Sequence, residues 1–293
     1  MPFPMTIDLH VHSHFSDGTK SPAELVRLAA KTGVSAIALT DHDTMDGVAE
    51  AEAESAYWDV EVVPGVELSV VHEKRVLHIL GYYVDPLQED LANALSTLQT
   101  ARDRRNEKII TKLQALGIDA SLEELQQISG LGQTGRPHIA KLLINHGVVR
   151  SFSQAFDQYL AQDKKAYVGR FAYSAKEAIA FINAAGGLAV LAHPIQIDKT
   201  LCVLNSLLPV LQSYGLTGIE TYYPSQKKKM RKRIRKFAEK NKLFLTGGSD
   251  YHGDIRPGTR LAGGHNVYVP PELLDIMKQR LSKPVNESIS AAE

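Results

Sequence analysis

Short apolar runs of strand length alternate along the chain with longer segments in which apolar residues recur at helical spacing. This alternation is typical of an α/β protein with a parallel sheet or barrel. The predicted strands cover residues 5–11, 36–40, 61–67, 76–83, 188–192, 218–221, 243–246 and 266–269. The predicted helices cover residues 21–33, 49–58, 174–187, 201–214 and 226–241. The third and fourth predicted strands, 61–67 and 76–83, are joined by a short turn, so we expect them to be neighbours in the sheet.

The strand pattern disappears between residues 87 and 163, where several helical segments are broken by Gly117, Gly130 and Gly147. We therefore expect a helical subdomain, residues 87–163, that contributes to the substrate site. It would be inserted into a barrel made of residues 1–86 and 164–281. Residues 282–293 are expected to form a flexible tail.

Composition places few limits on the class of protein. Hydrophobic residues make up 44% of the 293 residues and charged residues 23%, which is ordinary for a globular chain and not for a disordered or membrane-embedded one. Lys plus Arg and Asp plus Glu both number 33, so net charge gives no general reason to bind nucleic acid or membrane. The single cysteine, Cys202, excludes an intramolecular disulfide and a multi-thiolate metal site. Without a signal peptide or a long apolar run, the chain is expected to be cytoplasmic.

Histidines and acidic residues gather at or just after the ends of five predicted strands. The carboxyl ends of barrel strands form one rim, which carries the catalytic residues in such folds. His10 and His12 are two residues apart in an extended strand, so their imidazoles point the same way. Further candidates along the chain are Asp17, Asp41, His42, Asp43, Glu67, His78, His193, Asp250 and His252.

Each candidate alone has an ordinary structural explanation: Asp17 stands in a turn motif, and His78 lies inside an apolar run. One shared metal centre is a simpler explanation than five coincidences. Imidazole and carboxylate ligands without thiolate suit Mn²⁺, Zn²⁺ or Fe²⁺. There are more ligands than one ion can use.

The chain resembles the PHP family, named for its polymerase-associated and histidinol-phosphatase members. The matching motifs are His10-x-His12, Ser16-Asp17-Gly18, Thr40-Asp41-His42-Asp43, Pro64-Gly65-Val66-Glu67, His78, Ala192-His193-Pro194 and Gly248-Ser249-Asp250-x-His252. The resemblance implies a distorted, TIM-like barrel of seven βα units with three divalent cations at its rim, Mn²⁺ before Zn²⁺ or Fe²⁺. It implies a first cation held by His10, His12, Glu67 and Asp250, a second by Asp17, His42 and His252, and a third by His78, His193 and a shared Glu67.

Within that family, the insertion and its Gly135-Arg136-Pro137-His138 segment are most similar to the nucleoside 3′,5′-bisphosphate phosphatase and RNase AM-like branch. This resemblance implies that Arg136 and His138 reach from a loop over the rim to hold substrate phosphate, with His14 as a further candidate. The planar guanidinium of arginine suits phosphate oxygens. The histidines at 72, 146 and 265 are left as surface or structural residues.

The activity implied is hydrolysis of a phosphate ester by a hydroxide that bridges two cations. Asp250 and His193 are both candidates for proton transfer, and the sequence does not choose between them. The expected substrates are a small phosphorylated nucleotide or the 5′ end of a short RNA, and no protein partner is implied.

Three alternatives stay open at this point. A histidinol-phosphatase-like activity is the nearest alternative. An amidohydrolase acting on C–N bonds would normally have a carbamylated lysine where Glu67 stands. A non-catalytic PHP module would have lost ligands, and this chain keeps them.

A basic run from Lys227 to Lys236 lies in the predicted helix 226–241, in which Met230, Ile234 and Phe237 should face the core. It is either a solvated helix face or an electrostatic guide for RNA.

Overall fold

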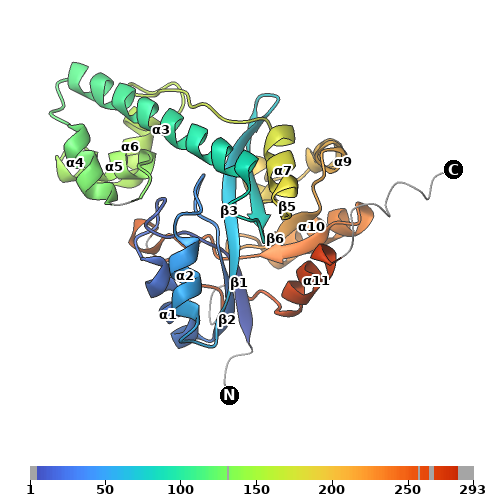
Figure 1. The fold of residues 1–293 in the computed structure, drawn as a ribbon. Coiled ribbons are helices and arrows are strands. Elements are labelled where there is room, and N and C mark those ends of the chain that lie inside the picture. The colour runs from blue at the N-terminus through green and yellow to red at the C-terminus, as the bar shows by residue number, and fades with distance from the viewer. Residues whose placement is uncertain (1–4, 131, 257, 264–266, 283–293) are drawn as a thin grey trace.

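The computed structural model describes residues 5–130, 132–256, 258–263 and 267–282 (Figure 1). Its strands form one sheet in chain order: β1 (Thr6–Val11), β2 (Val34–Leu39), β3 (Glu61–His72), β4 (Arg75–Tyr82), β5 (Leu188–Leu191), β6 (Gly218–Tyr222) and β7 (Phe244–Gly247). β1 to β3 are parallel, as are β5 to β7, whereas β4 is antiparallel to both of its neighbours. Beyond β7, Tyr251 bridges to Val11, so the sheet curls round to meet its first strand. The predicted α/β fold is confirmed.

Helices cover the sheet: α1 (Pro22–Thr32), α2 (Val48–Ser55), α7 (Ala175–Ala184), α8 (Pro194–Ile197), α9 (Leu204–Ser213), α10 (Lys228–Lys240) and α11 (Glu272–Leu281). Two of them begin with reciprocal capping hydrogen bonds. The Ser21 hydroxyl accepts from Glu24 N and the Glu24 carboxylate accepts from Ser21 N, and Ser174 and Glu177 repeat this arrangement.

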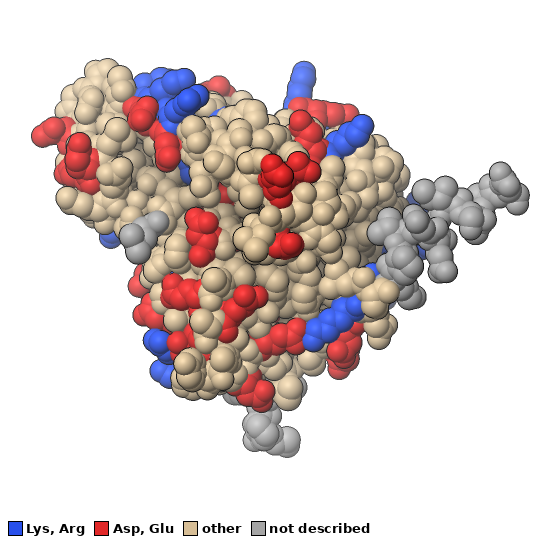
Figure 2. Space-filling model, in the orientation of Figure 1, with Lys and Arg blue, Asp and Glu red and all other residues tan. Residues whose placement is uncertain are grey.

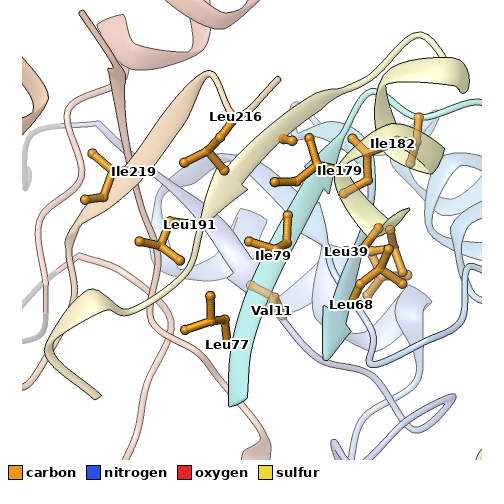
Figure 3. Close-up of a cluster of buried hydrophobic side chains, with 14 of the residues drawn as sticks. Val11, Leu39, Leu68, Leu77, Ile79, Ile179, Ile182, Leu191, Leu216 and Ile219 are labelled. Carbon is orange, nitrogen blue, oxygen red and sulfur yellow. The ribbon is translucent and has the colours of Figure 1, made fainter. Parts of the chain in front are cut away.

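Two hydrophobic clusters fix the position of the strands. The outer cluster lies between the sheet and its helices and includes Val11, Leu39, Leu68, Leu77, Ile79, Ile179, Ile182, Leu191, Leu216 and Ile219 (Figure 3). The inner cluster joins the opposite, inner face of the same strands to α11 and includes Val63, Leu80 and Met277. Because side chains alternate along a strand, Glu67 shares the face of Val63 and His78 shares the face of Leu80. Both polar side chains therefore point to the inner face.

The segment between β4 and β5 contains α3 (Glu89–Ala115), α4 (Leu122–Ser129), α5 (Arg136–Asn145), α6 (Phe152–Ala155) and a π-helical turn (Phe156–Leu160). The start of α3 packs on the outer cluster through Leu91, Leu95 and Leu98. Its second half packs with α4 to α6 in a separate cluster that includes Ile109 and Leu113. Figure 1 shows α4, α5 and α6 grouped at the far end of α3.

Several sequence predictions are wrong in detail. β3 does not end at Glu67 but continues to His72, because residues 65–72 pair with the antiparallel β4 in a hairpin. Residues 267–269 form no strand; Val269 O accepts a 3.3 Å hydrogen bond from Ile7 N beside β1. Residue 266 and the predicted tail from residue 283 lie outside the described residues. Within the described ranges, no helix has the length and apolar composition required to cross a membrane.

Candidate metal centre

Nine imidazole and carboxylate side chains come together at the rim of the sheet, and all are buried or half-buried. They are the nine predicted from the sequence: His10, His12, Asp17, His42, Glu67, His78, His193, Asp250 and His252. Segments that are up to 242 positions apart in the chain therefore meet at one site.

Glu67 lies in the middle of this group, and its two carboxylate oxygens face different histidines. Its Oε2 atom is 3.3 Å from both His10 Nε2 and His12 Nε2. Its Oε1 atom is 2.7 Å from His78 Nδ1 and 3.0 Å from His193 Nε2. Oε2 is also 3.0 Å from His42 Nδ1, so the two oxygens of this carboxylate face two separate sets of imidazoles, as a ligand shared by two cations would.

Asp250 divides its oxygens in a similar way. Oδ1 faces the centre, 3.6 Å from His10 Nε2 and 3.3 Å from His12 Nε2. Oδ2 accepts hydrogen bonds from the Tyr223 hydroxyl, at 2.7 Å, and from Arg256. Asp250 also has a positive φ of 53°, a conformation uncommon for residues other than glycine. Neither Tyr223 nor Arg256 was predicted from the sequence.

Asp17 forms a third arrangement with two histidines. Its Oδ1 atom is 3.3 Å from His252 Nε2 and 3.9 Å from His42 Nε2. The His12 ring lies close to both, with centroid distances of 4.2 Å to His252 and 4.6 Å to His42. His12 therefore lies between this group and the Glu67–Asp250 group.

The two acids beside His42 have structural partners. Asp41 accepts hydrogen bonds from Ser13 N, Ser13 Oγ and Ser16 Oγ, and so holds the loop that carries Asp17. Asp43 pairs with Arg102 of α3 and accepts a hydrogen bond from Ser69 N. These contacts explain three consecutive ionisable residues after β2 without making all of them ligands.

Glu220 of β6 is a functional residue that the sequence analysis missed. It is fully buried, with Oε1 3.0 Å from His10 Nδ1 and Oε2 accepting a 2.6 Å hydrogen bond from His193 N. A carboxylate on the far nitrogen of a ligating histidine fixes its orientation and tautomer. The signal was an acidic residue inside the apolar strand 218–221, because a buried carboxylate requires partners.

Unpartnered polar atoms test whether this centre suits cations. Buried polar atoms almost always have a hydrogen-bond partner. Within the described residues, eight buried atoms without one belong to this group: His10 Nε2, both ring nitrogens of His12, Asp17 Oδ1, His42 Nδ1, Glu67 Oε2, His193 Nδ1 and His252 Nε2. Several lie 3.0–3.3 Å from a carboxylate oxygen without forming an aligned hydrogen bond. The residues fit divalent cations placed between them.

Electrostatics supports the same fit. Burial disfavours ionised Glu67, but the imidazoles of His78, His42 and His10 hold its pKa well below the usual value. Burial lowers the pKa of His42 to about 3, against the opposing effect of Glu67 and Asp17. Burial also acts to lower the pKa of His10, but Glu67, Glu220 and Asp250 outweigh it and raise that pKa. Protons and cations therefore compete for this centre.

A cavity of about 590 Å³ opens beside the centre. Asp17, His42 and His78 form part of its wall, and the rest includes four arginines: Arg102, Arg105, Arg136 and Arg170. Among the described residues, only Arg102 of these four forms an ion pair, with Asp43. Burial lowers the pKa of the other three, and neighbouring guanidinium groups lower that of Arg105 further. The cavity therefore presents unneutralised positive charge to the metal centre.

The structure corrects the expected placement of Arg136 and His138. Both lie in the first turn of α5 and not in a loop. Arg136 lines the arginine cavity, donates a 3.2 Å hydrogen bond to Leu160 O and stacks on Phe156. His138 accepts a hydrogen bond from Gly135 N through Nδ1 and lines a separate cavity of about 480 Å³ together with His14. Two residues apart on a helix, the side chains of Arg136 and His138 point in different directions.

The histidines at positions 72, 146 and 265 are not among the nine residues of the centre. His72 contacts the ring of Tyr214, and His146 pairs with Glu124 at 3.0 Å. His265 lies outside the described residues.

A barrel rim that brings imidazoles and carboxylates together without thiolate, beside an arginine-lined cavity, defines a metal-dependent hydrolase. The PHP domain matches residues 8–180, and the chain belongs to this family. The resemblance predicted from the motifs is confirmed.

Known relatives agree with this family. The chain is 35% identical over 245 residues to a 5′-3′ exoribonuclease of Haemophilus influenzae, covering 84% of this chain and 89% of the relative. It is 31% identical over 284 residues to a 3′,5′-nucleoside bisphosphate phosphatase of Chromobacterium violaceum, covering 96% and 99%. A solved structure described as a metal-dependent phosphoesterase from Bifidobacterium adolescentis is similar with a TM-score of 0.85 and 29% identity, covering 96% of this chain and 98% of that one.

Proposed function

We propose that this protein hydrolyses a phosphate ester of a nucleotide: that of a nucleoside 3′,5′-bisphosphate, or one at the phosphorylated 5′ end of a short RNA. The main observation that supports this proposal is the arginine-lined cavity that opens on the centre. Guanidinium groups bind phosphate oxygens in pairs, and four of them in one cavity suit a substrate with more than one phosphate. The names of the two relatives describe these same substrate types.

The proposed metal ligands are those that the family resemblance implies, and the short distances between them support the assignment. A first cation would be held by His10, His12, Glu67 and Asp250, a second by Asp17, His42 and His252, and a third by His78, His193 and Glu67. Mn²⁺ is the proposed metal, with Zn²⁺ and Fe²⁺ as alternatives. A bound divalent cation polarises phosphoryl oxygens and makes hydroxide available near neutral pH.

The protein's own groups orient the substrate and stabilise charge. Arg136, whose side chain is fixed on Phe156 and Leu160, is proposed to hold the phosphoryl group against the centre. Arg105 and Arg170 would neutralise the second phosphate. Charge stabilisation by fixed donors is the main requirement of phosphoryl transfer. Asp250 and His193 are proposed as the residues that can pass a proton to the leaving oxygen. His14 and His138 would contact substrate from the separate cavity that they line.

The same cavity disfavours the alternatives. Histidinol phosphate carries an ammonium group, which four arginines would repel. A neutral amide substrate would gain nothing from these arginines, and Glu67 stands where an amidohydrolase normally has a carbamylated lysine. A non-catalytic module has no need of eight unpartnered ligand atoms at its rim.

The test offers Mn²⁺-loaded protein four substrates: a nucleoside 3′,5′-bisphosphate, a 5′-phosphorylated short RNA, histidinol phosphate and an amide panel. We expect kcat/KM for a nucleotide substrate to exceed that for histidinol phosphate by roughly 100-fold or more, as two lost charge-assisted contacts imply. Asp250→Asn should abolish turnover, whereas Arg136→Met should mainly raise KM. Preference for histidinol phosphate or an amide, or no turnover with metal bound, would contradict the proposal.

A further inference from the structure

Helix α10 concentrates the positive charge of a protein that is neutral overall. Eight of its 13 residues are Lys or Arg and one is acidic, while the whole chain has 33 basic and 33 acidic residues. The face shown in Figure 2 carries scattered Asp and Glu over α1 and α2, so a basic surface is not a general property of this protein.

No ion pair joins an α10 cation to a carboxylate within the described ranges of the chain. Six of the Lys and Arg side chains line a groove of about 800 Å³, together with Tyr222 at the end of β6 and Glu239, the one acidic residue of α10. Lys228, Lys232 and Arg235 follow one another at helical spacing and are exposed. Together they form a continuous basic stripe with an aromatic ring beside it.

The start of α10 lies close in the chain to a residue of the metal centre. Tyr223, next to Tyr222, donates the 2.7 Å hydrogen bond to Asp250. Lys228 is five positions after Tyr223, so at most about 17 Å of extended chain lies between the site and the start of the stripe. The helix continues for about 20 Å beyond that point.

The apolar side of α10 is already used by the fold. Ile234 and Ala238 are buried in the outer hydrophobic cluster, and Met230 and Phe237 pack against it. Membrane-surface helices need an exposed apolar face to enter the headgroup layer. α10 has none to offer, so its free surface suits a hydrophilic polyanion.

We propose that the α10 groove binds the body of a single-stranded RNA whose 5′ end lies in the metal centre. This inference rests on the proposed function and narrows it to a polynucleotide substrate. Lysines and arginines would neutralise successive phosphates, and Tyr222 would stack on a base, the combination that single-strand binders use.

The test compares wild type with the triple variant Lys228→Gln, Lys232→Gln, Arg235→Gln, each loaded with Mn²⁺. Substrates are a nucleoside 3′,5′-bisphosphate and a 5′-phosphorylated RNA of about 12 nucleotides, at several salt concentrations. For the RNA, we expect KM of the variant to rise roughly tenfold and its log–log salt slope to flatten by about 2 units, from three lost phosphate contacts. Turnover of the bisphosphate should not change.

A matched variant, Lys31→Gln, Lys74→Gln, Lys176→Gln, removes three exposed lysines elsewhere and should behave as wild type. An unchanged RNA KM and salt slope in the α10 variant would overturn the inference while leaving the proposed function intact, provided that the bisphosphate is hydrolysed. Pelleting of wild type with phosphatidylserine vesicles together with an unchanged RNA KM would instead assign the surface to a membrane. If wild type hydrolyses neither substrate, the proposed function itself fails.

Discussion

The Tyr223 hydroxyl donates a 2.7 Å hydrogen bond to Oδ2 of Asp250, which leaves Oδ1 to face the metal centre. We expect Tyr223→Phe to weaken metal binding roughly 10- to 100-fold, the usual cost of losing a partner of a metal ligand. The fold should be retained, because only one hydroxyl is removed. Competition with a chelating dye measures the affinity, and Tyr57→Phe, at an exposed position, is the control. Unchanged affinity would show that Arg256 alone orients Asp250.

Glu220 sets the tautomer of His10. Its carboxylate faces His10 Nδ1 at 3.0 Å, so Nδ1 carries the proton and Nε2 is free to face the centre. In Glu220→Gln the amide can donate to Nδ1 and force the proton onto Nε2, which then cannot bind a cation. We expect roughly a tenfold or greater loss of metal affinity and of kcat. Glu52→Gln, at an exposed position, should have no effect; equal metal content in both variants would contradict the assignment.

Arg105 is expected to contribute to substrate binding but to lower the stability of the substrate-free protein. It is 5% exposed, lies among three other arginines, and makes a 3.3 Å hydrogen bond to Asn106. Replacing a buried charge by an apolar side chain of similar size often stabilises a protein. Arg105→Met should therefore stabilise the substrate-free protein by about 1 kcal/mol, and Tm should rise by about 2–4 °C. KM for the bisphosphate should rise roughly tenfold. The exposed Arg104→Met is the control, and a fall in Tm would contradict this account.

Metal affinity should depend on pH through His12. Burial acts to lower its pKa, but the nearby carboxylates of Asp250 and Glu67 raise it to about 9. Below that pH the protonated imidazole must lose a proton before it can bind a cation, so protons weaken the metal site as pH falls. We expect Mn²⁺ affinity, measured by calorimetry, to rise about tenfold per unit between about pH 6 and pH 8. A flat profile would exclude His12 as a ligand.

Sequence patterns were sufficient wherever the signal is local. Strand and helix periods predict the elements, and the capping residues Ser21 and Ser174 mark two helix starts correctly. Residues just after parallel strands, such as His42 and His193, could be assigned to one rim because parallel strands end on one edge. The structure brings all nine of the predicted metal-ligand candidates together.

Contacts between distant segments were harder to predict. Glu220 contacts His10, 210 positions away, and His193, 27 positions away. Tyr223 contacts Asp250, 27 positions away, and Arg256 contacts Asp250 across a turn. Arg102, Arg105 and Arg170 face the centre because α3 and the segment before α7 pack beside the rim, which no local pattern indicates. Arg136 and His138 were assigned to one loop, but a helix start directs them to two different cavities.

Metal content is the most direct test of the central claim that imidazoles and carboxylates from separate strands form one cation-binding centre. The protein is loaded with Mn²⁺, freed of excess metal by gel filtration and measured by elemental analysis, beside Glu67→Gln. We expect the wild type to retain about three ions per chain and the variant to lose at least two, because the two oxygens of Glu67 face two separate sets of imidazoles. Folded, active wild type without bound transition metal, or a variant with unchanged metal content, would contradict the account.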